Sequence, residues 1–248
     1  MDKWQIFCAG NTKAARYTAN YLKSLGLPIT DALSDSVGHL LLDVPSFEAS
    51  GNLRLGGSVE NLLAQLPRET VIYGGNLNHP ALAGFQTVDF LQDEGYLAEN
   101  AYITAECALD VALPYMKVTL RRCPVLVIGW GRIGKCLGQL LKAMGADVTI
   151  AARKPADLSM IHALGYHAED TASMADSLGH YRLIFNTVPA PVLNQEQMAF
   201  CRPNCVKIEL ASKNGMDDAD VILARGLPGL HLPESSGKLI AETFLRYY

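Results

Sequence analysis

The sequence lacks the marks of several large classes of protein. No apolar run reaches the roughly 18 residues of a membrane-spanning helix, and no cluster of lysine or arginine points to nucleic acid or an anionic membrane, since the net charge is −4. The start of the chain, from Met1 to Trp4, has no apolar segment typical of a secretory signal. We therefore predict no membrane and no nucleic acid among its partners, and we expect a cytoplasmic location.

The six cysteines also lack the usual motifs. Cys201 and Cys205 are too widely spaced for a C-x-x-C motif, and no pair of histidines joins them. Most of the cysteines lie in apolar runs, where a free thiol behaves as a small hydrophobic side chain. We predict no metal site. A chain of 248 residues can bury a sufficient hydrophobic core without disulfide bonds or a structural metal.

The clearest signal present is a strand, a glycine turn, a helix and a second strand. The apolar run 125–128 has the length of a strand, and Gly129, Gly131 and Gly134 follow it in the spacing G-x-G-x-x-G. A helical pattern then ends at Gly145 and leads into a further strand. In this context the glycines permit a tight turn, backbone approach to a pyrophosphate and close packing of the helix on the sheet. The stretch predicts a dinucleotide site rather than a turn that only packs a helix.

The end of the second strand favours NADP over NAD. An NAD site usually has a carboxylate about 20 residues after the turn, to bind the ribose 2′-hydroxyl. Here the sequence is Ala152, Arg153 and Lys154, and the first carboxylate is Asp157. Arg153 could bind a 2′-phosphate through two hydrogen bonds, and Lys154 could add a second charge. NAD stays open, as does the alternative that both cations are ordinary surface residues.

Strands and helices alternate along the chain, which predicts an α/β fold with mainly parallel sheets. Residues 100–120 are predicted to form one long helix between the two halves, and a last helix is expected to be capped by Ser235. The fold class is two-domain α/β, with long interdomain helices. The predicted parts are a smaller flavodoxin-like domain (1–99), an interdomain helix (100–122), a Rossmann domain (123–232) and a C-terminal helix at the interdomain region (233–248).

The residues that follow the later strands complete the predicted crevice, because ligands of open parallel sheets bind outside the carboxyl ends of the strands. One strand leads into residues 186–189, beside the nicotinamide half of a cofactor, and another into residues 211–213. The predicted cofactor-binding residues are Gly129, Trp130, Gly131, Arg132, Ile133, Gly134, Ala152, Arg153, Lys154, Asn186, Thr187, Val188, Pro189 and Ala211.

These stretches together resemble the A subunit of dipicolinate synthase, a two-domain relative of the D-2-hydroxyacid dehydrogenases. The resemblance lies in residues 127–134, 152–153, 186–189, 210–213 and 226–229, followed by Pro233 and Gly237. Asn100, Thr104 and Glu106 match a further element of the family, although Cys107 replaces its glycine; the first ninety residues fit more loosely.

The resemblance implies an enzyme, an NAD(P)-dependent dehydrogenase of sporulating cells. It would transfer hydride between NADP and a dihydrodipicolinate-type cyclic dicarboxylate, together with a flavoprotein-like B subunit, and a homodimer is expected. Two other functions stay open. The chain could be another small-acid NAD(P)-dependent dehydrogenase, or a catalytically silent NADP-binding regulatory or assembly subunit.

The candidate catalytic residues are Lys213 and Glu106. Lys213 could bind a substrate carboxylate or act as a base, and Glu106 could transfer the proton; the alternatives are a surface lysine in a turn and a solvated helical glutamate. His231 is a weaker candidate for a general acid, because a lone histidine more often has a packing role. The predicted substrate-binding residues are Asn100, Thr104, Ser212, Gly226, Leu227, Pro228 and Gly229, of which the last four would form a loop over the substrate.

Overall fold

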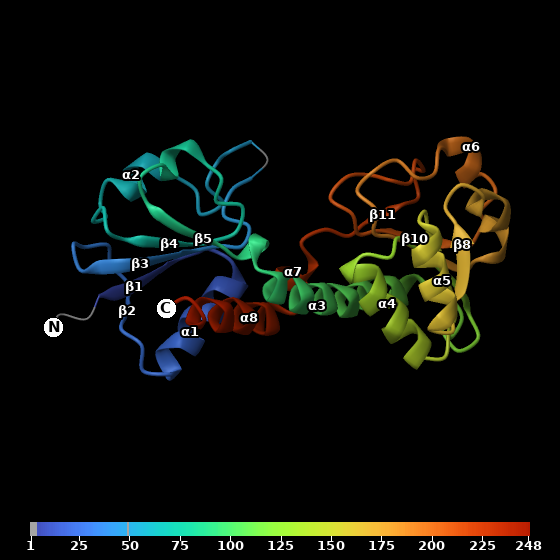
Figure 1. Ribbon diagram of the computed structural model, residues 1–248, viewed down its shortest axis with the longest axis horizontal. Helices are drawn as coiled ribbons and strands as arrows, with labels where there is room; N and C mark the ends of the chain where they lie inside the picture. The colour runs from blue at the N-terminus through green and yellow to red at the C-terminus, as the bar shows by residue number, and fades with distance from the viewer. Residues whose placement is uncertain (1–3, 49) are drawn as a thin grey trace. The chain divides into compact units, whose positions relative to one another are not determined.

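The structure is a computed structural model that describes residues 4–48 and 50–248 (Figure 1). The expectation of a cytoplasmic location rests partly on residues 1–3, which lie outside the described residues. The chain divides into two compact units. The first unit consists of Met1–Asn100 together with Pro228–Tyr248, and the second unit is Ala101–Leu227. Each unit contains one parallel sheet, as the alternation of strands and helices predicts.

The first unit has a five-stranded sheet in the order β2-β1-β3-β4-β5. This order is the one found in flavodoxin-like doubly wound sheets. Helices α1 and α8 lie on one side of the sheet and α2 on the other (Figure 1). The elements are β1 (Gln5–Ala9), α1 (Lys13–Ser24), β2 (Ile29–Thr30), β3 (Val37–Leu42), α2 (Val59–Leu63), β4 (Val71–Gly74), β5 (Gln86–Asp89) and α8 (Pro233–Leu245).

The last helix, α8, packs against α1 of the first unit. At the crossing, Thr18 Oγ1 donates a hydrogen bond of 3.0 Å to Gly237 O, and a Cβ at Gly237 would lie 2.5 Å from Ala14 O. The predicted cap is wrong. The helix starts at Pro233, before Ser235, because a proline in the first turn gives up an N–H that would have no helical partner. Its buried face includes Leu239, Ile240, Thr243 and Phe244.

The second unit has a six-stranded sheet in the order β11-β10-β9-β6-β7-β8. Counted from β6, this is the Rossmann strand order, and it reverses direction between β6 and β9. The elements are β6 (Pro124–Ile128), α4 (Arg132–Ala143), β7 (Asp147–Ala152), α5 (Pro155–Ala163), β8 (His167–Asp170), β9 (Leu183–Asn186), α6 (Gln195–Met198), β10 (Val206–Glu209) and β11 (Ile222–Leu223).

The connecting helix α3 (Glu94–Ala112) starts and ends earlier than the predicted 100–120. It starts early because Asp93 Oδ1 accepts a hydrogen bond of 2.6 Å from the N–H of Tyr96. It ends early because Pro114, in the 3-10 turn that follows, has no N–H to donate. Within the described parts of the chain, neither α3 nor any other helix has the length and apolar character needed to cross a membrane.

Asp93 also fixes the C-terminal segment of the first unit. Its carboxylate accepts hydrogen bonds from Arg246 Nη2 at 2.9 Å and from the Tyr247 hydroxyl at 2.6 Å. Burial alone would raise the pKa of Asp93, but the hydrogen bonds from Tyr247, Tyr96 and Arg246 outweigh burial and lower the pKa to about 2. The start of α3 and the end of the chain are therefore held by one carboxylate.

Residues 226–229 do not form the predicted loop. Gly226 has a left-handed φ of +64°, and a short helix, α7 (Leu227–His231), begins directly after it. Pro228 lies in the first turn of this helix, where its missing N–H costs nothing. The segment also contains the division between the units, because Leu227 belongs to the second unit and Pro228 to the first.

Candidate functional site

The glycine turn after β6 has the geometry that a dinucleotide site requires. Gly129 has a φ of +109°, and a Cβ there would collide with Thr187 Oγ1. A Cβ at Gly134 would collide with the carbonyl oxygen of Gly129, so only glycine lets α4 pack this close to the turn. At Gly131, in contrast, no described atom lies within 4 Å of the Cβ position. The open space at Gly131 is where a pyrophosphate would approach the start of α4.

A cavity of about 720 Å³ lies over this turn, outside the carboxyl ends of β6, β7 and β9. Its position is the point where the strand order reverses, which is where doubly wound sheets bind ligands. The cavity is lined by Gly129, Trp130, Gly131, Ala151, Ala152, Arg153, Lys154, Asp157, Asp170, Thr171, Ala172, Val188, Ala190, Pro191 and Val192.

The end of β7 gives the cavity two cations. Ala152 is buried at the last position of the strand, and Arg153 and Lys154 follow with exposed side chains on the cavity wall. Two carboxylates, Asp157 and Asp170, also line the cavity. Asp170 is used locally, because its Oδ1 accepts a hydrogen bond of 2.9 Å from the N–H of Ala172. The place directly after the strand, where a ribose 2′-hydroxyl would need an acceptor, is occupied by a guanidinium group.

The remaining predicted residues of the turn are Trp130, Arg132 and Ile133. Arg132 and Ile133 form the first turn of α4. Trp130 is half-buried at the cavity wall, its ring 6.0 Å from that of Tyr166 in an edge-on contact, and Lys135 Nζ lies 5.5 Å from the Trp130 ring centroid. The indole is therefore contacted from two sides at the cavity wall.

The loop after β9 is shaped by Asn186 and Thr187. Asn186 is fully buried; its Nδ2 donates to Val188 O and its Oδ1 accepts from the N–H of Val188, both at 3.0 Å. Thr187 Oγ1 donates to Ile128 O at 2.9 Å, which ties the loop to the end of β6. Val188 lines the cavity, and Pro189 is exposed. Asn186 and Thr187 thus support the backbone of the loop, and a direct contact with a cofactor stays a prediction.

Sequence reasoning missed Glu209, the most highly connected polar residue of this region. Glu209 is fully buried at the end of β10 and pairs in register with Asn186. Its Oε1 accepts hydrogen bonds from Asn186 Nδ2 at 2.8 Å and from the N–H of Ala211 at 3.1 Å. Its Oε2 accepts from the N–H groups of Gly215 at 2.7 Å and Met216 at 3.2 Å. One carboxylate therefore joins the loops that follow β9 and β10.

The loop after β10 presents Ser212 and Lys213, both exposed. Arg225 holds this loop from its other side, because its Nε donates to Ala211 O at 3.0 Å and its Nη2 donates to Asn214 Oδ1 at 2.5 Å. Lys213 lies between two fixed ends, on the same edge of the sheet as the glycine turn. The position, at the carboxyl end of a central strand, is the predicted one.

The residues predicted on α3 do not share one face. Asn100 and Thr104 are four residues apart and lie on the same side of the helix. Glu106 is two residues after Thr104, which places it on nearly the opposite side. The difference is visible in burial, since Thr104 is buried and Glu106 is exposed. Asn100 belongs to the first unit, and Thr104 and Glu106 to the second. The pairing of Glu106 with Asn100 and Thr104 around one ligand is therefore disfavoured by helix geometry.

The amino-acid sequence is similar to that of a dipicolinate synthase A subunit. The A subunit of dipicolinate synthase from Bacillus subtilis (strain 168) is 27% identical over 193 residues, which cover 73% of this chain and 65% of that protein. The match therefore spans about two thirds of the length of the relative. No family model matches the chain.

Solved structures agree in fold over most of this chain. The A subunit of dipicolinate synthase from Bacillus halodurans is 21% identical with a TM-score of 0.86, covering 100% of this chain and 98% of that one. An L-alanine dehydrogenase is 10% identical with a TM-score of 0.69, covering 98% of this chain and 79% of that one. At such identities the likeness concerns the fold of two Rossmann-like parallel α/β domains. Sequence and fold agree, and the resemblance of this chain to the family of dipicolinate synthase A subunits is confirmed.

Proposed function

We propose that this chain is an NADP-linked oxidoreductase that transfers hydride between the nicotinamide and a dihydrodipicolinate-type cyclic dicarboxylate. The observation that carries the proposal is the cavity over the glycine turn, open at Gly131 and bordered by Arg153 directly after β7. The substrate class rests on the resemblance in sequence and fold to the A subunit of dipicolinate synthase.

Arg153 supports NADP because of what its guanidinium can do at this position. A 2′-phosphate accepts two parallel hydrogen bonds from arginine, whereas an NAD site usually has a carboxylate directly after the strand, where this chain has Arg153. Lys154, the next residue, adds a second positive charge at the cavity wall. Together they offset Asp157 and Asp170, which would otherwise repel a phosphate.

The chain itself would bind and orient the reactants. The bound cofactor supplies the hydride chemistry. The backbone of the loop after β9 would position the nicotinamide half, and the loop after β10 would present Lys213 to a carboxylate of the substrate. Lys213 is the better supported of the two candidate catalytic residues, because its loop is fixed by Glu209 and Arg225.

The cofactor choice is tested by Arg153→Asp, with the exposed Lys117→Asp as a matched charge control. Losing charge-assisted hydrogen bonds worth about 1.5–3 kcal/mol should weaken NADPH binding about tenfold to a hundredfold. NADH binding should change little. Fluorescence titration of both cofactors measures this, and equal loss of NADPH and NADH affinity would refute the NADP assignment.

The substrate is tested by incubating the purified chain with a dihydrodipicolinate and NADP⁺, with and without a flavoprotein-like second subunit. We propose that this subunit is a partner and that the chain works as a homodimer. Formation of reduced nicotinamide together with the ultraviolet absorbance of an aromatic pyridine dicarboxylate supports the proposal. Tight NADPH binding without any turnover in either mixture would instead indicate a silent regulatory or assembly subunit.

A second candidate function is oxidation of another small hydroxy or amino acid on the same scaffold. It is favoured by the fold likeness to an L-alanine dehydrogenase and by the orientation of Glu106 away from Asn100 and Thr104. A panel of small acids with NADP⁺, followed by nicotinamide fluorescence, separates the two. Turnover of a monocarboxylate at a higher kcat/KM than the cyclic dicarboxylate would replace the first proposal with the second.

A further inference from the structure

Two cysteines face each other beside the turn that leads into β10. Cys201 is half-buried and Cys205 is 8% exposed, and the two thiols are close enough for each to shift the pKa of the other. Both pack in the apolar cluster that also contains Met198. The pairing was not expected from the spacing, because a C-x₃-C segment in an extended strand would place the two side chains far apart.

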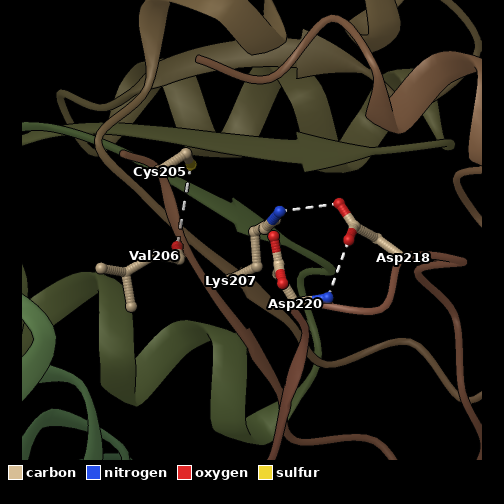
Figure 2. Close-up of polar contacts among 5 residues, drawn as sticks. All are labelled: Cys205, Val206, Lys207, Asp218 and Asp220. Carbon is tan, nitrogen blue, oxygen red and sulfur yellow. Dashed lines mark hydrogen bonds and ion pairs between the residues drawn. The ribbon is translucent and has the colours of Figure 1, made fainter. Parts of the chain in front are cut away.

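The turn between the two residues brings the thiols together. The N–H of Cys201 donates to Met198 O, at the end of α6, and the N–H of Cys205 donates to Arg202 O, both at 3.0 Å. These bonds reverse the chain at Pro203 and Asn204, both exposed. Cys205 lies directly before the strand, and its Sγ donates a hydrogen bond of 3.7 Å to Val206 O, drawn as a dashed line in Figure 2.

A buried cation lies next to this pair. Lys207 Nζ is 2.7 Å from Asp218 Oδ2, and Asp218 Oδ1 accepts a hydrogen bond of 2.8 Å from the N–H of Asp220 (Figure 2). The interaction with the Cys205 thiol, and then the positive charge of Lys207, lower the pKa of Cys201 against the opposing effects of burial and Asp218. The pKa of Cys205 is raised by the same interaction and by burial.

The two thiols therefore differ as an attacking and a resolving cysteine do. Cys201 is the more accessible of the two, and Cys205 is buried beside it. Cys8 shows the opposite environment, because burial and the charge of Asp31 raise its pKa to about 12. A thiol such as Cys8 is expected to be inert toward oxidants.

We propose that Cys201 and Cys205 are a redox modification site, which closes to an intrachain disulfide when a hydroperoxide reaches Cys201. The Cys201 thiolate attacks one peroxide oxygen, the O–O bond breaks, and the released oxygen leaves as water or an alcohol after taking a proton. The sulfenic acid on Cys201 is then attacked by Cys205 sulfur. The S–S bond forms, the S–O bond breaks, and a water molecule leaves with the Cys205 proton. Two thiols are oxidised by two electrons, and the peroxide is reduced.

A single tryptic peptide allows a direct test of this proposal. Trypsin does not cleave Arg202 because Pro203 follows it, so residues 183–207 form one peptide that contains Cys201 and Cys205 and no other cysteine. The full chain is treated with hydrogen peroxide, unfolded in iodoacetamide and digested without reduction. We expect this peptide to carry no alkyl group and to be lighter than the reduced peptide by two hydrogen atoms. Dithiothreitol should restore two alkylation sites.

Control variants separate the bridge from general oxidation. Cys136→Ser should leave the mass shift unchanged, whereas Cys201→Ser and Cys205→Ser should each abolish it. The wild-type peptide decides the question even if a variant fails to fold. Full alkylation of both cysteines after peroxide, oxygen addition to Cys201 without loss of two hydrogens, or a bridge between two chains on a non-reducing gel would overturn the proposal. The inference does not depend on the proposed dehydrogenase function.

Discussion

Replacing Glu209 by glutamine should destabilise the second unit without creating a cavity. Glutamine has the same size but only one acceptor oxygen, and its amide nitrogen is a donor. Glu209 accepts four hydrogen bonds, two on each oxygen. In glutamine, the amide nitrogen would face two of these four donor groups and could accept from neither. Each buried donor left without an acceptor costs about 1–3 kcal/mol.

The two lost hydrogen bonds sum to roughly 2–6 kcal/mol, and local relaxation brings the expected loss to about 3 kcal/mol. That is a large part of the roughly 5–15 kcal/mol by which folded domains are stable. The matched control is Glu196→Gln, an exposed glutamate on α6 of the same unit, for which a change within about 0.5 kcal/mol is expected.

The chain offers a selective probe for this measurement. It contains two tryptophans, Trp4 in the first unit and Trp130 in the second. In a Trp4→Phe background, the fluorescence of Trp130 follows unfolding of the second unit in urea. We expect Glu209→Gln to lower the urea midpoint and to weaken NADPH binding, because the loops after β9 and β10 lose their common anchor. An unchanged urea midpoint would refute the role assigned to Glu209.

Three further predictions use other parts of the structure. Gly131→Val should leave thermal stability unchanged, because the Cβ position is open and φ is −81°, but should abolish NADPH binding; retained binding by fluorescence titration would contradict the site. Gly237→Ala should destabilise the first unit by about 1–3 kcal/mol, since its Cβ would meet Ala14 O, and an unchanged melting temperature would contradict the described helix crossing. Because the folded-state pKa of Asp93 is lowered to about 2, its contribution is present above about pH 4 and is lost as pH falls toward 2. Asp93→Asn should reduce this loss of stability on acidification by about 1 kcal/mol, after allowance for solvent screening. Urea unfolding at about pH 4 and at about pH 2 measures the loss. If wild type and variant lost the same free energy of unfolding, Arg246 and Tyr247 would not hold Asp93.

Local signals predicted much of the fold because they act over a few residues. The strand before the glycine turn was predicted at residues 125–128 and is found at Pro124–Ile128. Gly26, Gly145 and Gly165 all end helices in a left-handed conformation, which the absence of a Cβ makes accessible. The tight turn at Gly129 and the close helix packing at Gly134 were predicted, and both are seen in the space around these glycines. The geometry of the turn could therefore be predicted from the sequence, whereas the approach of a pyrophosphate to Gly131 stays a prediction.

The parts that could not be predicted depend on contacts between residues far apart in the chain. The start of α3 is set by Asp93, whose carboxylate is held by Arg246 and Tyr247 from the end of the sequence. In β10, apolar residues alternate with Lys207 and Glu209, a pattern typical of a strand with one face in water. Both charged residues are buried, because Asp218 and the loop donors satisfy them.

The discontinuous first unit has a consequence for the order in which the protein folds during synthesis. Domains usually fold from the N-terminus as the chain emerges. Here the first hundred residues still lack α8, whose buried face completes the packing against α1, until the segment Pro228–Tyr248 has been made. The second unit, Ala101–Leu227, is continuous and can fold while that segment is still in the ribosome. The dinucleotide site is therefore expected to form before the unit that precedes it in the sequence is complete.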